Sequence, residues 1–277
     1  SSDSWELGVA HKYLAGYFFD QNMIPPSIES YNEAVSIFEW NISNAQGSED
    51  LKIDDIIECY ANLLDLEDNE TGPISEVRAD LCYKIANSYV QVNKHEDAVS
   101  MYREAIMIQS QLHGNDHLSV ANSLHNLGNC YRDLNDFQKS AECLNRSLSL
   151  STVNFQEENE EVADTCHCLA MTLMSTCELD EATSLFERAL AIRKTKLGAL
   201  DLNTASTLYS LAAINQMRGT WNNATKYFKE ALKIQRMTVG DDNTITARTL
   251  ECIGRIHMDK REFENAINYS ETMDEKI

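Results

Sequence analysis

Apolar residues along most of the chain recur three and four positions apart, and short polar stretches such as 134–136 and 218–220 separate the apolar segments. This spacing puts apolar side chains on one face of a helix, whereas a half-buried strand would alternate apolar and polar residues. Only 10 Gly and 3 Pro interrupt the 277 residues. Because Gly and Pro are the residues least compatible with helix interiors, the chain is predicted to be all-α.

A repeat of 42 residues organises these segments. Small residues recur at this interval at Ala86, Gly128, Ala170, Ala212 and Gly254. A second small series lies twelve residues later, at Ala98, Ser140, Ala182, Ala224 and Ala266, and a third comprises Ala105, Ser147, Ala189 and Ala231. Four residues after the second series come Tyr102, Leu144, Phe186 and Phe228, whereas Ser270 breaks the pattern.

Small side chains at fixed places allow two helices to cross closely, and large apolar side chains one turn away fill the groove between them. Each repeat is therefore predicted to be a helical hairpin. Gly114, Gly198 and Gly240 lie between hairpins, where glycine readily takes the positive φ that ends a helix. One hairpin cannot bury its apolar stripe alone, so we expect a right-handed α-solenoid over 76–277, with stacked repeats at about 76–117, 118–159, 160–201, 202–243 and 244–277.

Residues 1–75 depart from the period and are expected to form irregular acidic helices, as a degenerate repeat or cap. Segment 33–38 aligns with 97–102, so residues 28–43 resemble a second helix whose partner is 5–20. Pro25 and Pro26 are predicted to mark the turn between these two helices. Room remains for an additional acidic amphipathic helix near 51–66.

The small and large positions, with segments 124–132 (LHNLGNCYR) and 114–117 (GNDH), resemble the tetratricopeptide repeat family, and most closely the 42-residue variant found in kinesin light chains. The resemblance covers about residues 76 to 275. It implies a non-catalytic adaptor or scaffold that binds a peptide or helix of a partner protein. In this family the binding groove is the concave face, which is lined by the first helix of each hairpin.

Projecting the repeat onto that face gives candidate partner-binding residues: Lys84, Asn87, Asn122, His125, Asn126, Asn129, Arg132, His167, Met171, Tyr209, Met217 and Arg255. Amide and imidazole groups can pair with a peptide backbone, whereas Met and Tyr adapt to its side chains. The simpler alternative is that these residues only face solvent. We favour binding, because repeat proteins commonly use their concave face.

Two binding modes known in this fold fit the residues poorly. Co-chaperones of the fold grip a C-terminal carboxylate with asparagines and bases; Asn87 and Asn126 match the asparagines, but Asp164 and Cys168 stand where bases are needed. Kinesin light chains pair asparagines in the groove to receive tryptophan-acidic peptides, and of those pairs only 125–126 keeps one Asn here. These departures favour general peptide capture over either mode.

The net charge of −21 is concentrated at the front, where residues 1–80 hold 17 acidic and 3 basic residues. Nucleic acids and anionic membranes attract clustered Lys and Arg, so neither is an expected partner. A basic protein docking at the front, or simple solvation of the acidic faces, both remain open. No apolar stretch reaches the eighteen residues of a membrane span, so membrane insertion is not expected either.

The eight cysteines have no framework spacing and are expected to be buried thiols in the cytoplasm or another reducing compartment. The chain begins with Ser, so a targeting segment is potentially missing. Cys166, His167 and Cys168 invite a metal site, but helix neighbours point about 100° apart, and His113 and His117 lack further ligands at metal spacing. No phosphate loop or nucleophile motif occurs, so we expect no metal, no cofactor and no catalysis.

A second function class stays open: a fixed structural or assembly subunit of a large multiprotein complex. Exposure of Trp5, Phe18, Phe19 and Trp40 near the front would favour this alternative. An enzyme is the third class and would need a pocket that the repeat does not predict.

Overall fold

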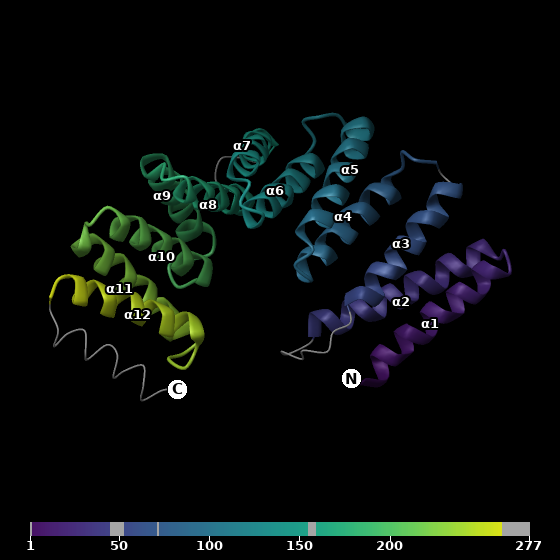
Figure 1. Ribbon diagram of the computed structural model, residues 1–277, viewed down its shortest axis with the longest axis horizontal. Coiled ribbons are helices and arrows are strands. Elements are labelled where there is room, and N and C mark those ends of the chain that lie inside the picture. Colours follow the sequence, from purple (N-terminus) through teal and green to yellow (C-terminus); the bar gives the residue numbers. More distant parts are fainter. Residues whose placement is uncertain (1, 45–52, 71, 155–158, 262–277) are drawn as a thin grey trace. The chain divides into compact units, whose positions relative to one another are not determined.

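The computed structural model describes residues 2–44, 53–70, 72–154 and 159–261 (Figure 1). These residues form twelve α-helices and no β-strand, which confirms the all-α prediction. They belong to two compact units, Ser1–Cys143 (unit 1) and Leu144–Ile277 (unit 2). Ala266 and Ser270, at which the repeat pattern weakens, lie outside the described residues.

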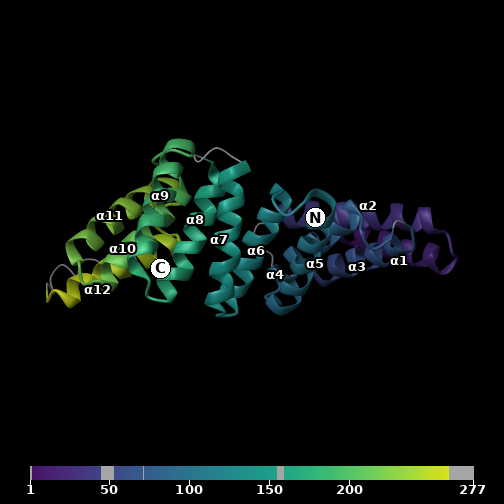
Figure 2. The same cartoon turned by 90° about the horizontal axis from the view of Figure 1, so that it is seen from above.

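Unit 1 contains six complete helices and the start of a seventh. They are α1 (Ser2–Asp20), α2 (Ile24–Asn44), α3 (Ile53–Glu70), α4 (Glu76–Gln91), α5 (His95–His113), α6 (Leu118–Asp133) and the beginning of α7 (Phe137–Asn154). The helices α1 and α2 pack as one hairpin and α4 and α5 as another, while α3 packs against both α2 and α4 (Figure 1, Figure 2). The extra helix predicted near 51–66 is α3, whose first turn carries Asp54 and Asp55.

Unit 2 repeats the hairpin. Its complete helices are α8 (Glu160–Ser175), α9 (Leu179–Lys196), α10 (Leu202–Met217), α11 (Trp221–Thr238) and α12 (Thr244–Asp259). The helices α8 and α9 pack together, as do α10 and α11, and α12 packs against α11. Each first helix begins at a polar residue whose side chain accepts a hydrogen bond from a backbone N–H, as Asn159 and Asp201 do for α8 and α10.

The predicted small and large series occupy the hairpin cores. Ala98, Ala182 and Ala224 have no exposed surface, and neither do Phe186 and Phe228 one turn later. A methyl group at the crossing point lets the second helix approach the first, and the aromatic ring fills the space beside it. The periodicity therefore encodes helix packing, as the sequence predicted.

The chain leaves its helices through residues with positive φ. Gly114 and Gly240 follow α5 and α11 with φ of 90° and 87°, values that side chains with a Cβ rarely adopt. Asn135, between α6 and α7, has φ of 61°, and asparagine is among the residues that tolerate this region. The linker glycines are therefore placed as predicted.

The turn predicted at Pro25 and Pro26 is wrong. Both prolines lie in the first turn of α2, and the chain reverses at 21–23, where Asn22 has φ of 59°. Proline fits this position because the first N–H groups of a helix need no intrahelical acceptor. Ala34 and Phe38 have no exposed surface, so α1 and α2 pack around the same small and large pair as the later hairpins.

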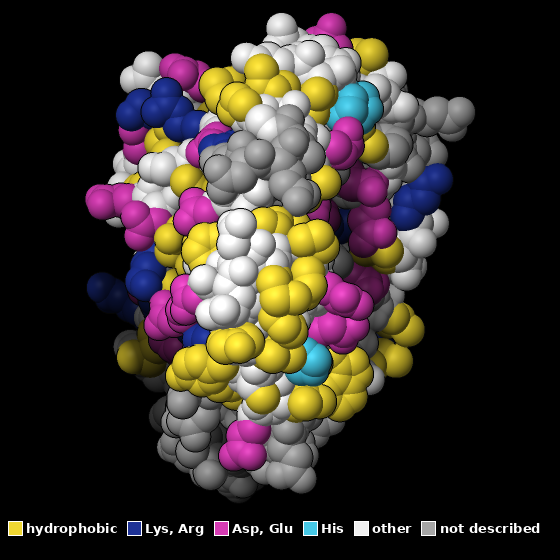
Figure 3. All heavy atoms as spheres, turned by 90° about the vertical axis from the view of Figure 1, so that its right-hand side faces the viewer, with side chains coloured by type: hydrophobic (Ala, Val, Ile, Leu, Met, Phe, Trp, Pro, Cys, Tyr) yellow, Lys and Arg dark blue, Asp and Glu magenta, His cyan; other side chains and the backbone are white. Residues whose placement is uncertain are grey.

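The outer face of α1 carries an apolar stripe (Figure 3). Leu7, Leu14 and Tyr17 follow helical spacing and are 52%, 44% and 60% exposed, and Tyr13 beside them is 71% exposed. Of the four aromatic residues considered above, Phe19 and Trp40 are exposed, Phe18 is half-buried, and Trp5 packs against Phe38 with ring centroids 4.4 Å apart. The stripe leaves a large apolar surface on unit 1.

Candidate functional site

In unit 1 the first helices α4 and α6 share a network of amides and hydroxyls. The Asn126 amide nitrogen donates to the Tyr83 hydroxyl at 2.9 Å and to the Asn87 carbonyl at 3.4 Å. The Tyr102 hydroxyl of α5 also donates to Asn87, and the rings of Tyr83 and Tyr102 meet edge to face at 5.8 Å. Burial raises the pKa of Tyr102 above its ordinary value, so its hydroxyl stays protonated as a donor. Two predicted residues, Asn87 and Asn126, thus hold α4 and α6 together.

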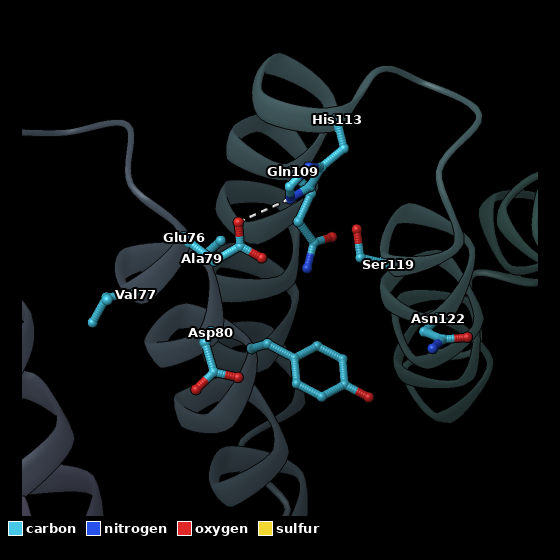
Figure 4. A pocket seen from close by; sticks show the side chains of 9 residues that line it. Glu76, Val77, Ala79, Asp80, Gln109, His113, Ser119 and Asn122 are labelled. Carbon is cyan, nitrogen blue, oxygen red and sulfur yellow. Dashed lines mark ion pairs between the residues drawn. The ribbon is translucent and has the colours of Figure 1, made fainter.

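Beside this network lies a pocket of about 510 Å³, open to solvent (Figure 4). The helices α4 and α5 and the start of α6 build it. Its lining residues are Glu76, Val77, Ala79, Asp80, Tyr83, Gln109, His113, Ser119 and Asn122. Of the predicted residues, Asn122 alone lines it, so the pocket extends the predicted face rather than coinciding with it.

The charged groups of the pocket are mainly carboxylates. Glu76 lies 3.1 Å from the His113 ring, and Asp80 lies 3.3 Å from the Lys84 ammonium one turn along α4. The Asp80 side chain is 59% exposed and Lys84 is 40% exposed, so this pair is well solvated and weak. Arg78, also on α4, is bound to Glu104 of α5 and does not neutralise the pocket.

Gln109 forms the floor of the pocket. It belongs to the second helix α5 and is 8% exposed. The Ser123 hydroxyl donates to its carbonyl oxygen at 2.9 Å. Since the carbonyl is held by Ser123, the NH₂ group is the end available to the cavity, and Figure 4 shows the amide pointing into it.

Unit 2 places a different side chain at the equivalent position, 84 residues later. Arg193 of α9 is buried, and its guanidinium donates to Asp164 at 2.6 Å, to the Thr207 hydroxyl at 2.6 Å and to the Asn203 carbonyl at 3.0 Å. It also lies 3.3 Å from the His167 ring. His167 is one of the predicted residues, and here it belongs to an internal guanidinium site.

The other predicted residues of unit 2 are dispersed along its first helices. The Met171 sulfur accepts from the Ser210 hydroxyl at 3.7 Å, and the Tyr209 hydroxyl lies 3.2 Å from the Cys252 sulfur. Burial is the main cause that raises the pKa of Tyr209 to about 12, and the contact with Cys252 acts in the same direction. Met217 is 53% exposed, and exposed Arg255 pairs with Glu251 on its own helix.

The remaining predicted residues of unit 1 lie on α4 and α6. Lys84 lies 5.9 Å above the Tyr60 ring as well as beside Asp80. Arg132 donates to Asn129 at 2.9 Å, three residues earlier on α6, and His125 is half-buried. None of these four side chains lines the pocket.

The described residues contain no group of three or more His, Cys, Asp and Glu side chains that could hold a metal ion. Cys166 is fully buried, and burial raises the pKa of its thiol, which keeps it protonated and inert. Among the described helices, none combines the length and hydropathy that a membrane span requires.

Sequence reasoning missed Glu76, Asp80, Gln109 and His113. The projection considered the exposed face of each first helix, whereas Gln109 and His113 belong to a second helix. A usable signal existed in the 42-residue register, because Gln109 stands at a position that the hairpin buries. A polar residue at a buried position needs a hydrogen-bond partner, which marks the position as unusual.

Helical hairpins of this spacing, packed in consecutive pairs, define a helical repeat protein. The sequence profile described as tetratricopeptide repeat matches residues 75–152, 161–237 and 204–272. The chain therefore belongs to the tetratricopeptide repeat family. Arrays of this repeat typically bind proteins or peptides and are typically non-catalytic.

Solved structures support this fold. A protein described as a kinesin light chain from Podosopora anserina, with nearly identical repeats, is 20% identical, with a TM-score of 0.62 over 70% of this chain and 92% of that one. BtubC from P. vanneervenii is 18% identical, with a TM-score of 0.61 over 91% of this chain and 90% of that one.

A third structure was solved with a peptide. The Rap conjugation gene regulator of plasmid pLS20, in complex with the Phr* peptide, is 17% identical, with a TM-score of 0.60 over 97% of this chain and 73% of that one. At these identities the likeness shows the fold alone. A comparison with curated protein sequences returns no match.

Proposed function

We propose that the chain is a non-catalytic adaptor or scaffold that binds a peptide or helix of a partner protein along the first helices of its hairpins. The observation that carries this proposal is the open pocket of about 510 Å³ between α4, α5 and α6. It combines an aromatic ring, amides and carboxylates with the apolar side chains of Val77 and Ala79, which is the mixture that peptide sites use. Binding of the Phr* peptide by a protein of similar fold adds support.

The network next to the pocket suits an extended segment. Asn87 and Asn126 are fixed by Tyr83 and Tyr102, so these amides lose little freedom when a ligand binds. Each amide retains hydrogen-bonding capacity that a peptide backbone can use. The face is therefore preorganised for main-chain contacts, while the adjacent pocket is available for one side chain.

The test is selection of a display library of random peptides on the immobilised chain, followed by anisotropy titration of the selected peptides. The variant Asn126→Ala with Arg132→Ala should weaken binding by about tenfold or more, because groups on α6 are removed. The matched control is Asn145→Ala with Arg103→Ala, which truncates the same residue types at exposed places on the second helices α7 and α5. Circular dichroism should show that both double variants are folded. Equal affinity of the two doubles would contradict the proposed face.

A fixed subunit of a larger complex is the second candidate, and the stripe of Leu7, Leu14 and Tyr17 on α1 favours it. Exposed apolar surface of this kind marks interaction sites. Replacing Leu7 and Leu14 with Gln should leave peptide binding unchanged and abolish co-purification with any stable partner. If the endogenous chain is recovered as a free monomer, this second candidate is wrong.

A further inference from the structure

We propose that the pocket of unit 1 receives the guanidinium group of an arginine side chain from the partner peptide, in the place that Arg193 fills from within the chain in unit 2. The inference rests on the proposed function, because it names the side chain that the bound peptide would insert. It predicts a preference for arginine at one position of the ligand.

Unit 2 provides the template for this site. The guanidinium of Arg193 is held by a carboxylate (Asp164), a hydroxyl (Thr207) and a backbone carbonyl (Asn203), with the His167 ring beside it. The Arg193 side chain is only 6% exposed. The hairpin geometry therefore creates a cavity whose walls accept hydrogen bonds from both terminal nitrogens of a guanidinium, while the buried Arg193 Nε has no hydrogen-bond partner among the described residues.

Four of these five positions line the pocket of unit 1, and the fifth, Ser123, hydrogen-bonds to Gln109. The equivalent pairs, 84 residues apart, are Asp80 and Asp164, Tyr83 and His167, Gln109 and Arg193, Ser119 and Asn203, and Ser123 and Thr207. The carboxylate and the ring are thus retained in unit 1, and so is the hydroxyl, which there donates to the Gln109 carbonyl and keeps its oxygen as an acceptor. What changes is the central side chain, because Gln109 is shorter than arginine and carries no charge.

The truncation leaves both space and unbalanced charge. The space is the pocket of about 510 Å³, and the charge is that of Asp80 and Glu76. The basic side chains that face these groups are His113, which contacts Glu76, and Lys84, which contacts Asp80. Lys84 is 40% exposed and can swing away at little cost, so Asp80 remains available to a cation entering the pocket.

Arginine fits better than lysine. The guanidinium presents five N–H donors in a planar fork, and the template in unit 2 uses this fork to reach three acceptors in different directions. Its plane can also stack on the Tyr83 ring. An ammonium group offers three donors from one point and cannot span the same acceptors.

The hairpin of α10 and α11 offers a comparison for this site. Gln235 of α11 occupies the position of Gln109, but Ser206 of α10 stands where unit 1 has Asp80. The buried Gln235 carbonyl has no hydrogen-bond partner among the described residues. A shortened floor residue together with a retained carboxylate is therefore found in unit 1 and not around Gln235.

The first experiment uses N-acetylarginine amide as the probe and its citrulline counterpart as a neutral isostere. Amide NMR spectra of the full chain should show shifts of the Gln109 side-chain NH₂ and of the Asp80 backbone with the arginine probe only. The variant Gln109→Arg should abolish the shift of the Asp80 backbone amide, because it supplies the guanidinium internally. Equal shifts with the citrulline probe would overturn the proposal.

The second experiment uses the peptides selected in the display library. Replacing their arginine with citrulline should weaken binding to the wild-type chain by about tenfold or more, since a charge-assisted bond is lost. Asp80→Asn should remove most of this difference, and the matched neutralisation Asp97→Asn, at an exposed place on α5, should preserve it. Asp80 is solvated, so Asp80→Asn keeps the test valid even if Gln109→Arg does not fold.

The outcomes separate the two levels of inference. If selected peptides bind but tolerate citrulline, the guanidinium assignment is wrong and the proposed function stands. If no peptide is selected while the arginine probe still shifts Gln109, the proposed function fails and the pocket assignment holds. Loss of the citrulline difference in Asp97→Asn as well would also contradict the site, since charge anywhere on unit 1 would then suffice.

Discussion

Unit 1 and unit 2 use the same hairpin, yet they differ at one buried position of the second helix. In unit 2 the position holds Arg193, which is paired within the chain; in unit 1 it holds Gln109, which leaves a pocket open. The aspartate that faces the position is present in both units, as Asp164 and Asp80. One unit therefore contains its own cation, while the other presents an unfilled acidic cavity.

The surrounding chemistry differs in the same direction. Unit 1 carries 24 acidic and 8 basic residues, whereas unit 2 carries 20 and 15. Unit 1 has Asn87 on its first helix α4 where unit 2 has Met171, and Tyr102 on its second helix α5 where unit 2 has Phe186. Unit 1 thus holds a hydrogen-bonded amide and hydroxyl at positions where unit 2 holds apolar side chains, so one repeat framework can carry either a polar or an apolar surface.

The largest expected contrast appears at alkaline pH. Burial raises the pKa of Cys59 and Cys130 to about 12 and that of Cys82 to about 11, all in unit 1, and it also raises the pKa of Tyr60 and Tyr102. In unit 2 the pKa is raised for Cys166 and Tyr209. In each of these groups the pKa is higher in the folded than in the unfolded chain. The free energy of unfolding is therefore undiminished below about pH 9 and falls as pH rises toward 12.

Relative to neutral pH, the free energy of unfolding at pH 11 should be lower by about 2 to 3 kcal/mol for each of Cys59 and Cys130. Unit 1 should therefore unfold before unit 2. Denaturant titrations followed by tryptophan fluorescence can separate the units, since Trp221→Phe leaves only Trp5 and Trp40 of unit 1 as reporters. Coincident loss of both units between pH 9 and 11 would contradict the contrast.

The next largest effect is expected for Arg193→Gln, which gives unit 2 the floor residue of unit 1. The change removes three hydrogen bonds of a buried guanidinium and should lower the free energy of unfolding by about 2 to 3 kcal/mol. Asp164 is 43% exposed and can return to water, which limits the loss. Urea titration measures the change, and Arg188→Gln, a half-buried arginine on the same helix, is the control. A loss below about 0.5 kcal/mol would show that the hydrogen bonds of Arg193 do not stabilise the fold.

The fold could be predicted from the sequence because hairpin packing depends on residue size at fixed intervals. Ala98 and Ala182 are buried at the crossings that the 42-residue period placed there. The front was harder, since Pro25 and Pro26 are compatible with a turn or with the first turn of a helix. Only the packing of α1 on α2 decides between these alternatives.

The pocket could not be predicted in the same way. Size patterns locate Gln109 in a buried row, but they do not reveal whether the space around a shortened side chain stays open. The candidate residues Asn87 and Asn126 were found because they recur on first helices, whereas their pairing with Tyr83 and Tyr102 depends on three-dimensional distances. Repeat-by-repeat comparison of polar residues at buried positions is the step that would have found the site.

A smaller effect is expected when the aromatic residues are exchanged between the units. Phe186→Tyr buries a hydroxyl at a position without exposed surface, where Met171, a weak acceptor, replaces the Asn87 of unit 1. It should lower the free energy of unfolding by about 1 to 2 kcal/mol. The reciprocal Tyr102→Phe removes the bond to Asn87 and should cost about 1 kcal/mol. Combining Phe186→Tyr with Met171→Asn should recover part of the loss, as a double-mutant cycle in urea would measure. Independent, additive losses would contradict the pairing of these positions.

The smallest effect concerns the aspartates themselves. Asp164→Asn deprives a buried guanidinium of its counter-charge and should lower the free energy of unfolding by about 1 kcal/mol, because Thr207 and Asn203 still hold Arg193. Asp80→Asn should change it by less than about 0.5 kcal/mol, because the solvated Asp80 has no buried cation to compensate. Urea titrations at low and high salt provide the measurement, and the difference should persist at high salt, since screening acts weakly on buried pairs. Equal effects would mean that the two aspartates stand in the same environment, and the distinction between a filled and an open site would then be lost.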